Sequence, residues 1–194
     1  MELTFDQMGL SEVLVKALKA KGFEKPTQIQ AETIPLALSD DRDIIGQAQT
    51  GTGKTAAFGL PILELLDPTD GPVQALVLTP TRELTLQVCN ELQELAGSKE
   101  IKITPIYGGQ SIVNQKQQLK KRNDIIVGTP GRIIDHLTNK NLRLKDVQFV
   151  VIDEADEMLN GGFIEDLELI LSKTKDRKST RLNSSHLVIS YAVF

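Results

Sequence analysis

The octapeptide Ala48-Gln-Thr-Gly-Thr-Gly-Lys-Thr55 is the stretch that decides the fold of this chain. It is close to the phosphate-binding loop GxxxxGK(S/T), with Ala48 in place of the first glycine. Gly51 and Gly53 let backbone N–H groups turn inward around phosphate oxygens at the start of a helix, whose N-terminus attracts anions. In that pattern Lys54 reaches the β- and γ-phosphates and Thr55 holds Mg²⁺. A strand before the loop and a helix after it make an ordinary glycine-rich turn the weaker interpretation.

Apolar runs typical of β-strands alternate with helical patterns along the first 175 residues. The expected strands are 44–45, 73–78, 101–107, 125–127 and 147–152. Between the second and third runs, Leu84, Val88, Leu92 and Leu95 recur at three or four residues, and Gly97 supplies a stop. This alternation predicts the α/β class, with a mostly parallel sheet covered by helices on both faces.

Each expected strand is followed by a polar turn that carries glycine, proline or acidic residues. The turns in chain order are AQTGTGKT, TPTREL, YGGQ, GTPGR and DEAD. Open α/β sheets bind their ligands at the carboxyl ends of the strands. We therefore expect all five turns to meet at one edge of the sheet and to form the functional site there.

Asp153 and Glu154 follow the apolar run FVVI, where a second metal-binding carboxylate is needed. Asp153 can hold Mg²⁺ through water, while Glu154 can orient and deprotonate the attacking water. Two acidic residues after a strand, taken alone, usually form a solvated helix cap. Paired with Lys54 and Thr55, they predict a site for nucleotide hydrolysis.

The segments TPTRE and TPGR share one pattern at two strand-to-helix junctions. Each offers threonine as an N-cap, proline in the first turn and an arginine, Arg82 or Arg132. Together with Gly108 and Gly109, the two helix starts could follow the phosphates of one nucleic-acid strand without reading its bases. Without the other motifs, two well-capped helices would be the simpler interpretation.

Composition limits the remaining choices. The chain has 194 residues, 40% apolar and 25% charged, which suits one domain with a real core. No apolar run approaches the ~20 residues of a membrane span, and we expect no membrane association. The single cysteine, Cys89, fits a reducing, cytoplasmic location and lies beside the apolar stripe, so we expect a packed residue without a reactive role. A net charge of −4 requires nucleic acid to be held at local sites.

Taken together, these motifs resemble those of the DEAD-box RNA helicases over about residues 5–175. The segment Gly22-Phe-Glu-Lys-Pro-Thr-Gln-Ile-Gln30 is similar to the adenine-recognising segment of that family, with Phe5 as its isolated upstream aromatic residue. The resemblance implies a RecA-like P-loop domain that uses ATP and Mg²⁺. It also implies that Gln30 hydrogen-bonds the adenine edge and that Phe23 stacks on its face. From the residues alone, Phe23 would be assigned to the core, and Phe5 can still be a core residue.

The resemblance assigns roles to matching positions of this sequence. Catalysis falls to Lys54, Asp153 and Glu154, and the metal to Thr55 and Asp153. The ATP-binding set is Phe23, Thr27, Gln30, Thr50, Gly51, Thr52, Gly53, Lys54 and Thr55. The RNA-binding set is Pro80, Thr81, Arg82, Gly108, Gly109, Thr129, Pro130, Gly131 and Arg132. Asp156 is expected to couple the two sites, whereas His136 matches no catalytic motif and is expected to pack within a helix.

Features of the family that this sequence lacks shape a further expectation. A full member continues with a strand that ends in Ser-Ala-Thr and with a second RecA-like domain that supplies arginine fingers and further RNA contacts. We therefore expect 1–175 to be a domain truncated before that strand, with weak ATP binding and no unwinding of its own. Two alternatives stay open, namely another P-loop nucleic-acid-dependent ATPase or GTPase, and a non-catalytic ATP- or RNA-binding module.

The last residues, 176–194, differ from the rest in composition. Except for Leu187 and Val188, they can be back-translated in one frame into a sequence that resembles a widely used sequencing adapter with its variable index. We expect a non-native tail, against the alternatives of a basic RNA-binding extension or a natural last strand. The run LVISYAVF is β-branched and aromatic enough to form a strand. It could fill the vacant central position between the strands that lead to Lys54 and to Asp153.

Overall fold

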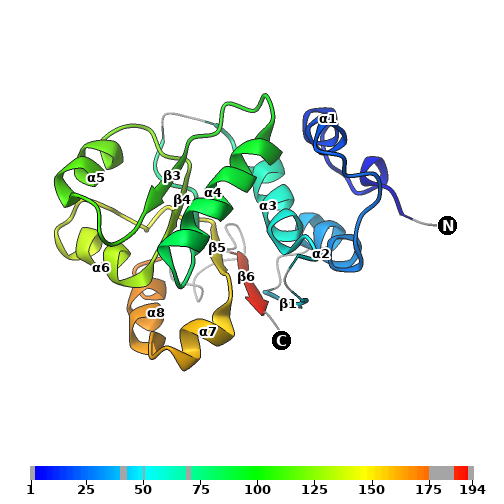
Figure 1. Ribbon diagram of the computed structural model, residues 1–194. Helices are drawn as coiled ribbons and strands as arrows, with labels where there is room; N and C mark the ends of the chain where they lie inside the picture. The colour runs from blue at the N-terminus through cyan, green and yellow to red at the C-terminus, as the bar shows by residue number, and fades with distance from the viewer. Residues whose placement is uncertain (1–2, 40–42, 50, 69–70, 175–185, 192–194) are drawn as a thin grey trace.

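A parallel six-stranded sheet forms the centre of the computed structural model, which describes residues 3–39, 43–49, 51–68, 71–174 and the backbone of 186–191 (Figure 1). The strands are β1 (Ile44–Gln47), β2 (Ala75–Leu78), β3 (Ile103–Ile106), β4 (Ile125–Gly128), β5 (Phe149–Ile152) and β6 (His186–Tyr191). Their order across the sheet is β1-β6-β5-β2-β4-β3, and every neighbouring pair is parallel. The predicted α/β class and the five predicted strands are confirmed.

Helices connect the strands and cover both faces of the sheet (Figure 1). They are η1 (Phe5–Gln7), α1 (Glu12–Ala20), α2 (Gln28–Ser39), α3 (Lys54–Leu65), α4 (Arg82–Ala96), α5 (Ile112–Leu119), α6 (Pro130–Thr138), α7 (Ala155–Asn160) and α8 (Ile164–Leu171). Residues of α3 and α4 share one buried cluster, and residues of α6, α7 and α8 share another. The two clusters therefore lie on opposite faces of the sheet.

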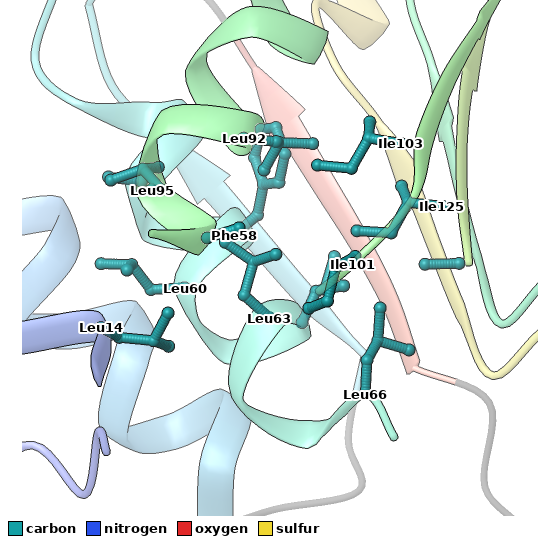
Figure 2. Close-up of a cluster of buried hydrophobic side chains, with 14 of the residues drawn as sticks. Leu14, Phe58, Leu60, Leu63, Leu66, Leu92, Leu95, Ile101, Ile103 and Ile125 are labelled. Atoms are coloured by element: carbon teal, nitrogen blue, oxygen red, sulfur yellow. The ribbon is translucent and has the colours of Figure 1, made fainter. Parts of the chain in front are cut away.

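Alternation along β2 explains why two cores form. Ala75 and Val77 belong to the cluster with α3 and α4, whereas Leu76 and Leu78 belong to the cluster on the other face. Successive side chains of a strand point to opposite faces, and a strand covered on both faces must be apolar throughout. All four residues are fully buried. Figure 2 shows the first cluster, in which Phe58 lies among side chains of α3, α4 and the strands.

The predicted helix behind Leu84 and Leu95 spans Arg82–Ala96 and ends at Gly97, whose φ of 58° lies in the left-handed half of the Ramachandran plot. Cys89 is buried on this helix, and burial raises the pKa of its thiol to about 12. His136 is fully buried in α6, so its predicted packing role is confirmed. No helix in the described part of the chain is long and apolar enough to cross a membrane.

Strand β6 occupies the central position predicted for the run LVISYAVF. It pairs on one side with β1, where Ile44 is opposite Val188, and on the other with β5, where Ile152 is opposite Ile189. The strand covers His186–Tyr191, slightly earlier than the predicted apolar run. Residues 175–185 and 192–194 of the tail lie outside the described residues.

Candidate nucleotide and nucleic-acid site

The carboxyl ends of the strands bring the five predicted turns to one edge of the sheet. The phosphate-binding loop follows β1, and Asp153 follows β5. The segments that begin at Thr79, Tyr107 and Thr129 follow β2, β3 and β4, which are adjacent in the order β2-β4-β3. The nucleotide motifs and the predicted RNA-binding motifs therefore occupy two neighbouring parts of one edge.

A cleft of about 450 Å³ opens at the nucleotide part of this edge. Its lining comes from the residues around the start of α2, the phosphate-binding loop with the first residues of α3, one face of α4, and the turn between β5 and α7. The residues are Phe23, Thr27, Gln30, Gly51, Thr52, Gly53, Lys54, Thr55, Leu84, Gln87, Glu91, Asp153 and Glu154. The structure thus gathers the predicted ATP-binding and catalytic residues around one cavity, except Thr50, which lies outside the described residues.

Gln30 fastens the predicted adenine-recognising segment to the phosphate-binding loop. Its side chain is fully buried, its Oε1 accepts a hydrogen bond from Thr27 N at 3.0 Å, and its Nε2 donates one to Gly53 O at 3.1 Å. Thr27 Oγ1 donates to Thr52 O at 2.8 Å. Buried amide groups need such partners because an unpaired one loses its hydration without compensation. Gly53 in turn has a φ of 82°, which suits glycine.

Phe5 and Phe23 form an edge-to-face pair whose ring centroids are 6.3 Å apart at an angle of 75°. This is a favourable geometry for aromatic rings. Phe5 is buried in the core, as one of its two interpretations predicted. Phe23 is half-buried and lines the cleft, so its ring is supported by Phe5 on one side and available to a ligand on another.

Lys54 carries the clearest sign of an anion-binding site. Its Nζ is buried and has no hydrogen-bond partner in the described part of the chain. It is the first residue of α3, where free backbone N–H groups create a positive end of the helix. A buried ammonium without a partner costs free energy, and a phosphate group would supply the acceptors. The donors at this helix start fit a polyphosphate.

Glu154 is held in a strained backbone conformation beside Asp153. Its φ of 51° is left-handed, and such a conformation costs on the order of 1–2 kcal/mol in a residue other than glycine. Glu154 N donates a hydrogen bond to Asp153 Oδ1 at 3.1 Å. Burial raises the pKa of the Glu154 carboxyl to about 7, with further contributions from a hydrogen bond with Glu157 and from the charge of Asp153, while Lys54 opposes them. A carboxyl group with a pKa near neutrality is suited to accept a proton.

Oxygen donors for a magnesium ion also meet in the cleft. Thr55 and Asp153 both line it, as predicted. Mg²⁺ commonly keeps several waters and takes only one or two protein ligands beside phosphate oxygens, so two donors suffice. No group of three or more His, Cys, Asp or Glu side chains suited to a metal occurs among the described residues.

Three residues of α4 line the cleft without having been predicted. Leu84, Gln87 and Glu91 are spaced by three and four residues, so they share one face of the helix. In the sequence, Leu84 belongs to the apolar stripe of this helix, and Gln87 and Glu91 belong to none of the motifs. Spacing shows which residues share a face, but the direction of that face depends on how α4 packs against α3.

The two helix starts at the RNA-predicted part of the edge differ in detail. Thr81 caps α4, because its Oγ1 accepts a hydrogen bond from Leu84 N at 3.2 Å. Thr129 occupies the same position before α6, but its side chain makes no capping bond. Pro130 is the first residue of α6, as predicted, whereas Pro80 precedes the cap. The predicted first-turn position of Pro80 is therefore wrong, because α4 begins one residue after the second threonine of TPTRE.

Arg82 and Arg132 are both tied to the segment that follows β3. The Arg82 guanidinium lies 5.0 Å from the centroid of the Tyr107 ring, a cation–π distance. Arg132 Nη1 donates a hydrogen bond to Gln110 O at 3.0 Å. The predicted RNA-binding residues of three different segments are therefore brought together. Asp156 lies half-buried in the first turn of α7, two residues after Glu154 of the cleft.

Comparison with known proteins agrees with this geometry. The DEAD/DEAH box helicase family matches residues 27–190. The DEAD-box ATP-dependent RNA helicase CshA of Geobacillus kaustophilus is 56% identical over 182 residues, which are 94% of this chain and 39% of that protein. CshA of Bacillus subtilis is 54% identical and is matched over 95% of this chain and 37% of its own length.

Solved structures lead to the same family. A DEAD box protein from Methanococcus jannaschii superposes with a TM-score of 0.90 and 44% identity, over 98% of this chain and 50% of that one. Saccharomyces cerevisiae Dbp5, in a structure with RNA and ADP BeF3, gives a TM-score of 0.86 and 34% identity, over 98% and 46%. The chain spans about two fifths of the length of the curated relatives it matches. With its RecA-like sheet and its motifs at one edge, the chain belongs to the DEAD/DEAH box helicase family.

Proposed function

We propose that this chain is the ATP-binding half of an ATP-dependent RNA helicase that unwinds RNA or remodels RNA–protein complexes. The observation that carries the proposal is the buried, unpartnered Lys54 Nζ at the start of α3. It lies in the same cleft as Asp153 and Glu154. A cationic group, a magnesium ligand and a group able to accept a proton are the parts that phosphoryl transfer to water requires.

Six residues of the cleft have separate roles in this proposal. Lys54 and the N–H groups at the start of α3 bind the phosphates, and Thr55 and Asp153 hold Mg²⁺. When bound, Mg²⁺ supplies charge that stabilises the phosphoryl group during transfer. Glu154 orients a water molecule and accepts its proton. Phe23 stacks on adenine and Gln30 hydrogen-bonds its edge, which selects ATP.

The RNA surface in this proposal is the edge formed by the segments after β2, β3 and β4. It consists of Pro80, Thr81, Arg82, Gly108, Gly109, Thr129, Pro130, Gly131 and Arg132. Helix N–H groups and arginines that contact phosphates hold a strand without reading its sequence. Asp156 would couple this surface to the nucleotide cleft.

The relatives are longer than this chain, and we propose that a second RecA-like domain completes both sites. Alone, the chain would bind ATP weakly and would not unwind RNA, because the arginine fingers would come from that second domain. Detecting RNA-stimulated ATP turnover by the 194-residue chain would contradict this part of the proposal.

The test is a chimaera that joins residues 1–174 to the remainder of the Geobacillus kaustophilus relative, which is 56% identical. We expect the chimaera to hydrolyse ATP but not GTP. Single-stranded RNA should raise the rate of ATP hydrolysis, and DNA should not. The matched variant Glu154→Gln keeps ATP binding and loses hydrolysis. Equal stimulation by DNA would favour another nucleic-acid-dependent ATPase, and binding without turnover in the unmodified chimaera would favour a non-catalytic module.

We also propose that residues 176–194 are foreign to the domain and that β6 fills the place of a native strand. The support is the adapter-like back-translation together with the position of β6 between β1 and β5. The family match extends to residue 190 and so includes most of this strand, and by itself it does not support the foreign origin. Genomic DNA that encodes Asp176–Phe194 with codons unlike the adapter throughout would refute the foreign origin.

A further inference from the structure

A buried hydrogen-bond network underlies the proposed RNA surface. At its centre is Gln115 of α5, which is fully buried although it is a polar residue. Its Nε2 donates to Tyr107 O at 2.9 Å, and its Oε1 accepts from Arg132 Nη1 at 2.9 Å. The same Oε1 lies 3.0 Å from His136 Nε2. One amide therefore joins the end of β3 to α6.

The bonds of Gln115 determine the protonation of His136. Arginine can only donate, so the Gln115 atom that Arg132 contacts must be the oxygen. That oxygen cannot donate to His136, which must therefore carry its proton on Nε2. His136 Nδ1 is then an acceptor for Asn141 Nδ2 at 3.3 Å. With Asn141 Nδ2 facing Nδ1, both ring nitrogens are satisfied in the neutral Nε2–H form.

The charges around His136 favour this neutral form. Burial lowers the pKa of the imidazole, and the Arg132 guanidinium lowers it further, while Asp135 opposes them. Protonation would also place Nδ1–H against the amide donor of Asn141. Two donors facing each other across this partly buried contact repel, so the uncharged ring is the form that fits the observed contacts.

The network also orients the Arg132 guanidinium. Nη1 donates to both Gln110 O and Gln115 Oε1, and Nε lies 3.3 Å from Asp135 Oδ2. The side chain is only 14% exposed. Within the part of the chain that the structure describes, Nη2 is left without a partner. The two N–H groups on that nitrogen are the ones available to a phosphate.

The segment that follows β3 is held by the same bonds. Tyr107 is fixed through its carbonyl by Gln115, its hydroxyl accepts from Gln110 Nε2, and its ring lies under Arg82. Gly108 and Gly109 lie between the fixed residues 107 and 110. Three parts of the proposed RNA surface thus depend on one buried amide and one neutral imidazole.

We propose that Gln115 and His136 are positioning residues that hold Arg132 and the 107–110 segment in the geometry that grips an RNA backbone. Neither contacts RNA, since both are fully buried. The inference rests on the proposed RNA-binding function of this edge. It assigns a functional reason to a histidine and a glutamine that the family motifs quoted above do not contain.

The first experiment is imidazole nitrogen NMR of the 194-residue chain labelled in histidine, in which His186 is the only other histidine. We expect His136 to show the neutral Nε2–H tautomer at pH 7 and to keep it below pH 6.5. The variant Gln115→Leu should change the tautomer balance. An Nδ1–H tautomer or an imidazolium at pH 7 in the unmodified chain would overturn the proposal.

The second experiment titrates decauridylate into the same chain at low salt and follows amide shifts. Gln115→Leu should weaken binding about tenfold and should move the Gly108 and Gly109 amides before RNA is added. Gln117→Leu, the same change at an exposed position of α5, should do neither. His136→Gln, which can still donate to Gln115, should retain more affinity than His136→Phe.

The outcomes separate this inference from the proposed function. If the unmodified chain shows no RNA-dependent shifts at residues 80–82, 108–109 or 129–132, the RNA surface itself is wrong. If it binds RNA and Gln115→Leu, with unchanged Mg·ATP binding, binds equally well, the positioning role is wrong. If Gln115→Leu does not fold, the two His136 variants decide, and equal RNA affinity in both would overturn the inference.

Discussion

Gly51 and Gly53 offer a matched pair for testing how the adenine-recognising segment is attached to the phosphate-binding loop. Their φ angles are nearly the same, 78° and 82°. A Cβ built on Gly51 meets nothing within 4 Å, whereas one on Gly53 lies 2.2 Å from Gln30 Nε2. Both alanine variants therefore share the cost of a left-handed alanine, and only Gly53→Ala displaces Gln30.

The additional cost of Gly53→Ala follows from the bonds of Gln30. Its side chain is buried and makes hydrogen bonds to Thr27 and Gly53, which contribute about 1 kcal/mol each. We expect Gly53→Ala to destabilise the chain by about 2 kcal/mol more than Gly51→Ala. For a domain of this size, that lowers the unfolding temperature by roughly 4–8 °C more.

Denaturant unfolding followed by circular dichroism measures the difference directly, and the double variant Gln30→Ala/Gly53→Ala isolates its cause. In the Gln30→Ala background, Gly53→Ala should lower the free energy of unfolding no more than Gly51→Ala does, because the amide that it would displace is absent. If the two glycine variants differ by less than ~0.5 kcal/mol in the unmodified background, the attachment through Gln30 is wrong.

Three further predictions concern the core, the chemistry and pH. Phe58→Ala, in the buried cluster of Figure 2, should cost about 3–5 kcal/mol in denaturant unfolding, while Leu65→Ala, 44% exposed on the same helix, should cost much less. Glu154→Gln in the chimaera should reduce kcat for ATP at least ~100-fold with little change in ATP affinity, as measured by steady-state kinetics and calorimetry. Folding lowers the pKa of His136 below its unfolded value of 6.5, so the contribution of His136 to stability is complete above pH 6.5 and falls as the pH drops further. The difference in denaturation midpoint between the unmodified chain and His136→Gln should therefore shrink from pH 8 to pH 5. A constant difference would contradict a depressed pKa.

Local sequence patterns predicted the sheet and the edge because both depend on short-range features. A strand buried on both faces must be apolar at every position, and β2, β4 and β5 are fully apolar or glycine and are buried throughout. The order of turns along the chain then placed the motifs, because parallel strands all end at one edge. The position of β6 was expected from the family resemblance, which implies a strand between those that lead to Lys54 and to Asp153.

The details that sequence could not predict are contacts between distant segments. Gln30 meets Gly53 across 23 residues, and Arg132 meets Gln110 across 22. The sequence predicts that Arg132 contacts RNA. In the structure its Nη1 already donates to Gln110 and Gln115, and its Nε lies beside Asp135. The left-handed Glu154 likewise depends on how β5 and α7 meet, since no glycine marks the turn. Spacing alone carries no information about such contacts.

The proposed function requires above all that a polyphosphate binds at Lys54. The direct measurement is thermal unfolding of the 194-residue chain with Mg·ATP or Mg·GTP, for the unmodified sequence and for Lys54→Met. ATP at ten times its Kd should stabilise the unmodified chain by about 1.4 kcal/mol, a rise of roughly 3–6 °C, and GTP at the same concentration should do less. Lys54→Met should respond to neither nucleotide, although without ligand it should be at least as stable, because a buried ammonium without a partner is removed. An equal rise with ATP in Lys54→Met would show that the phosphates bind elsewhere.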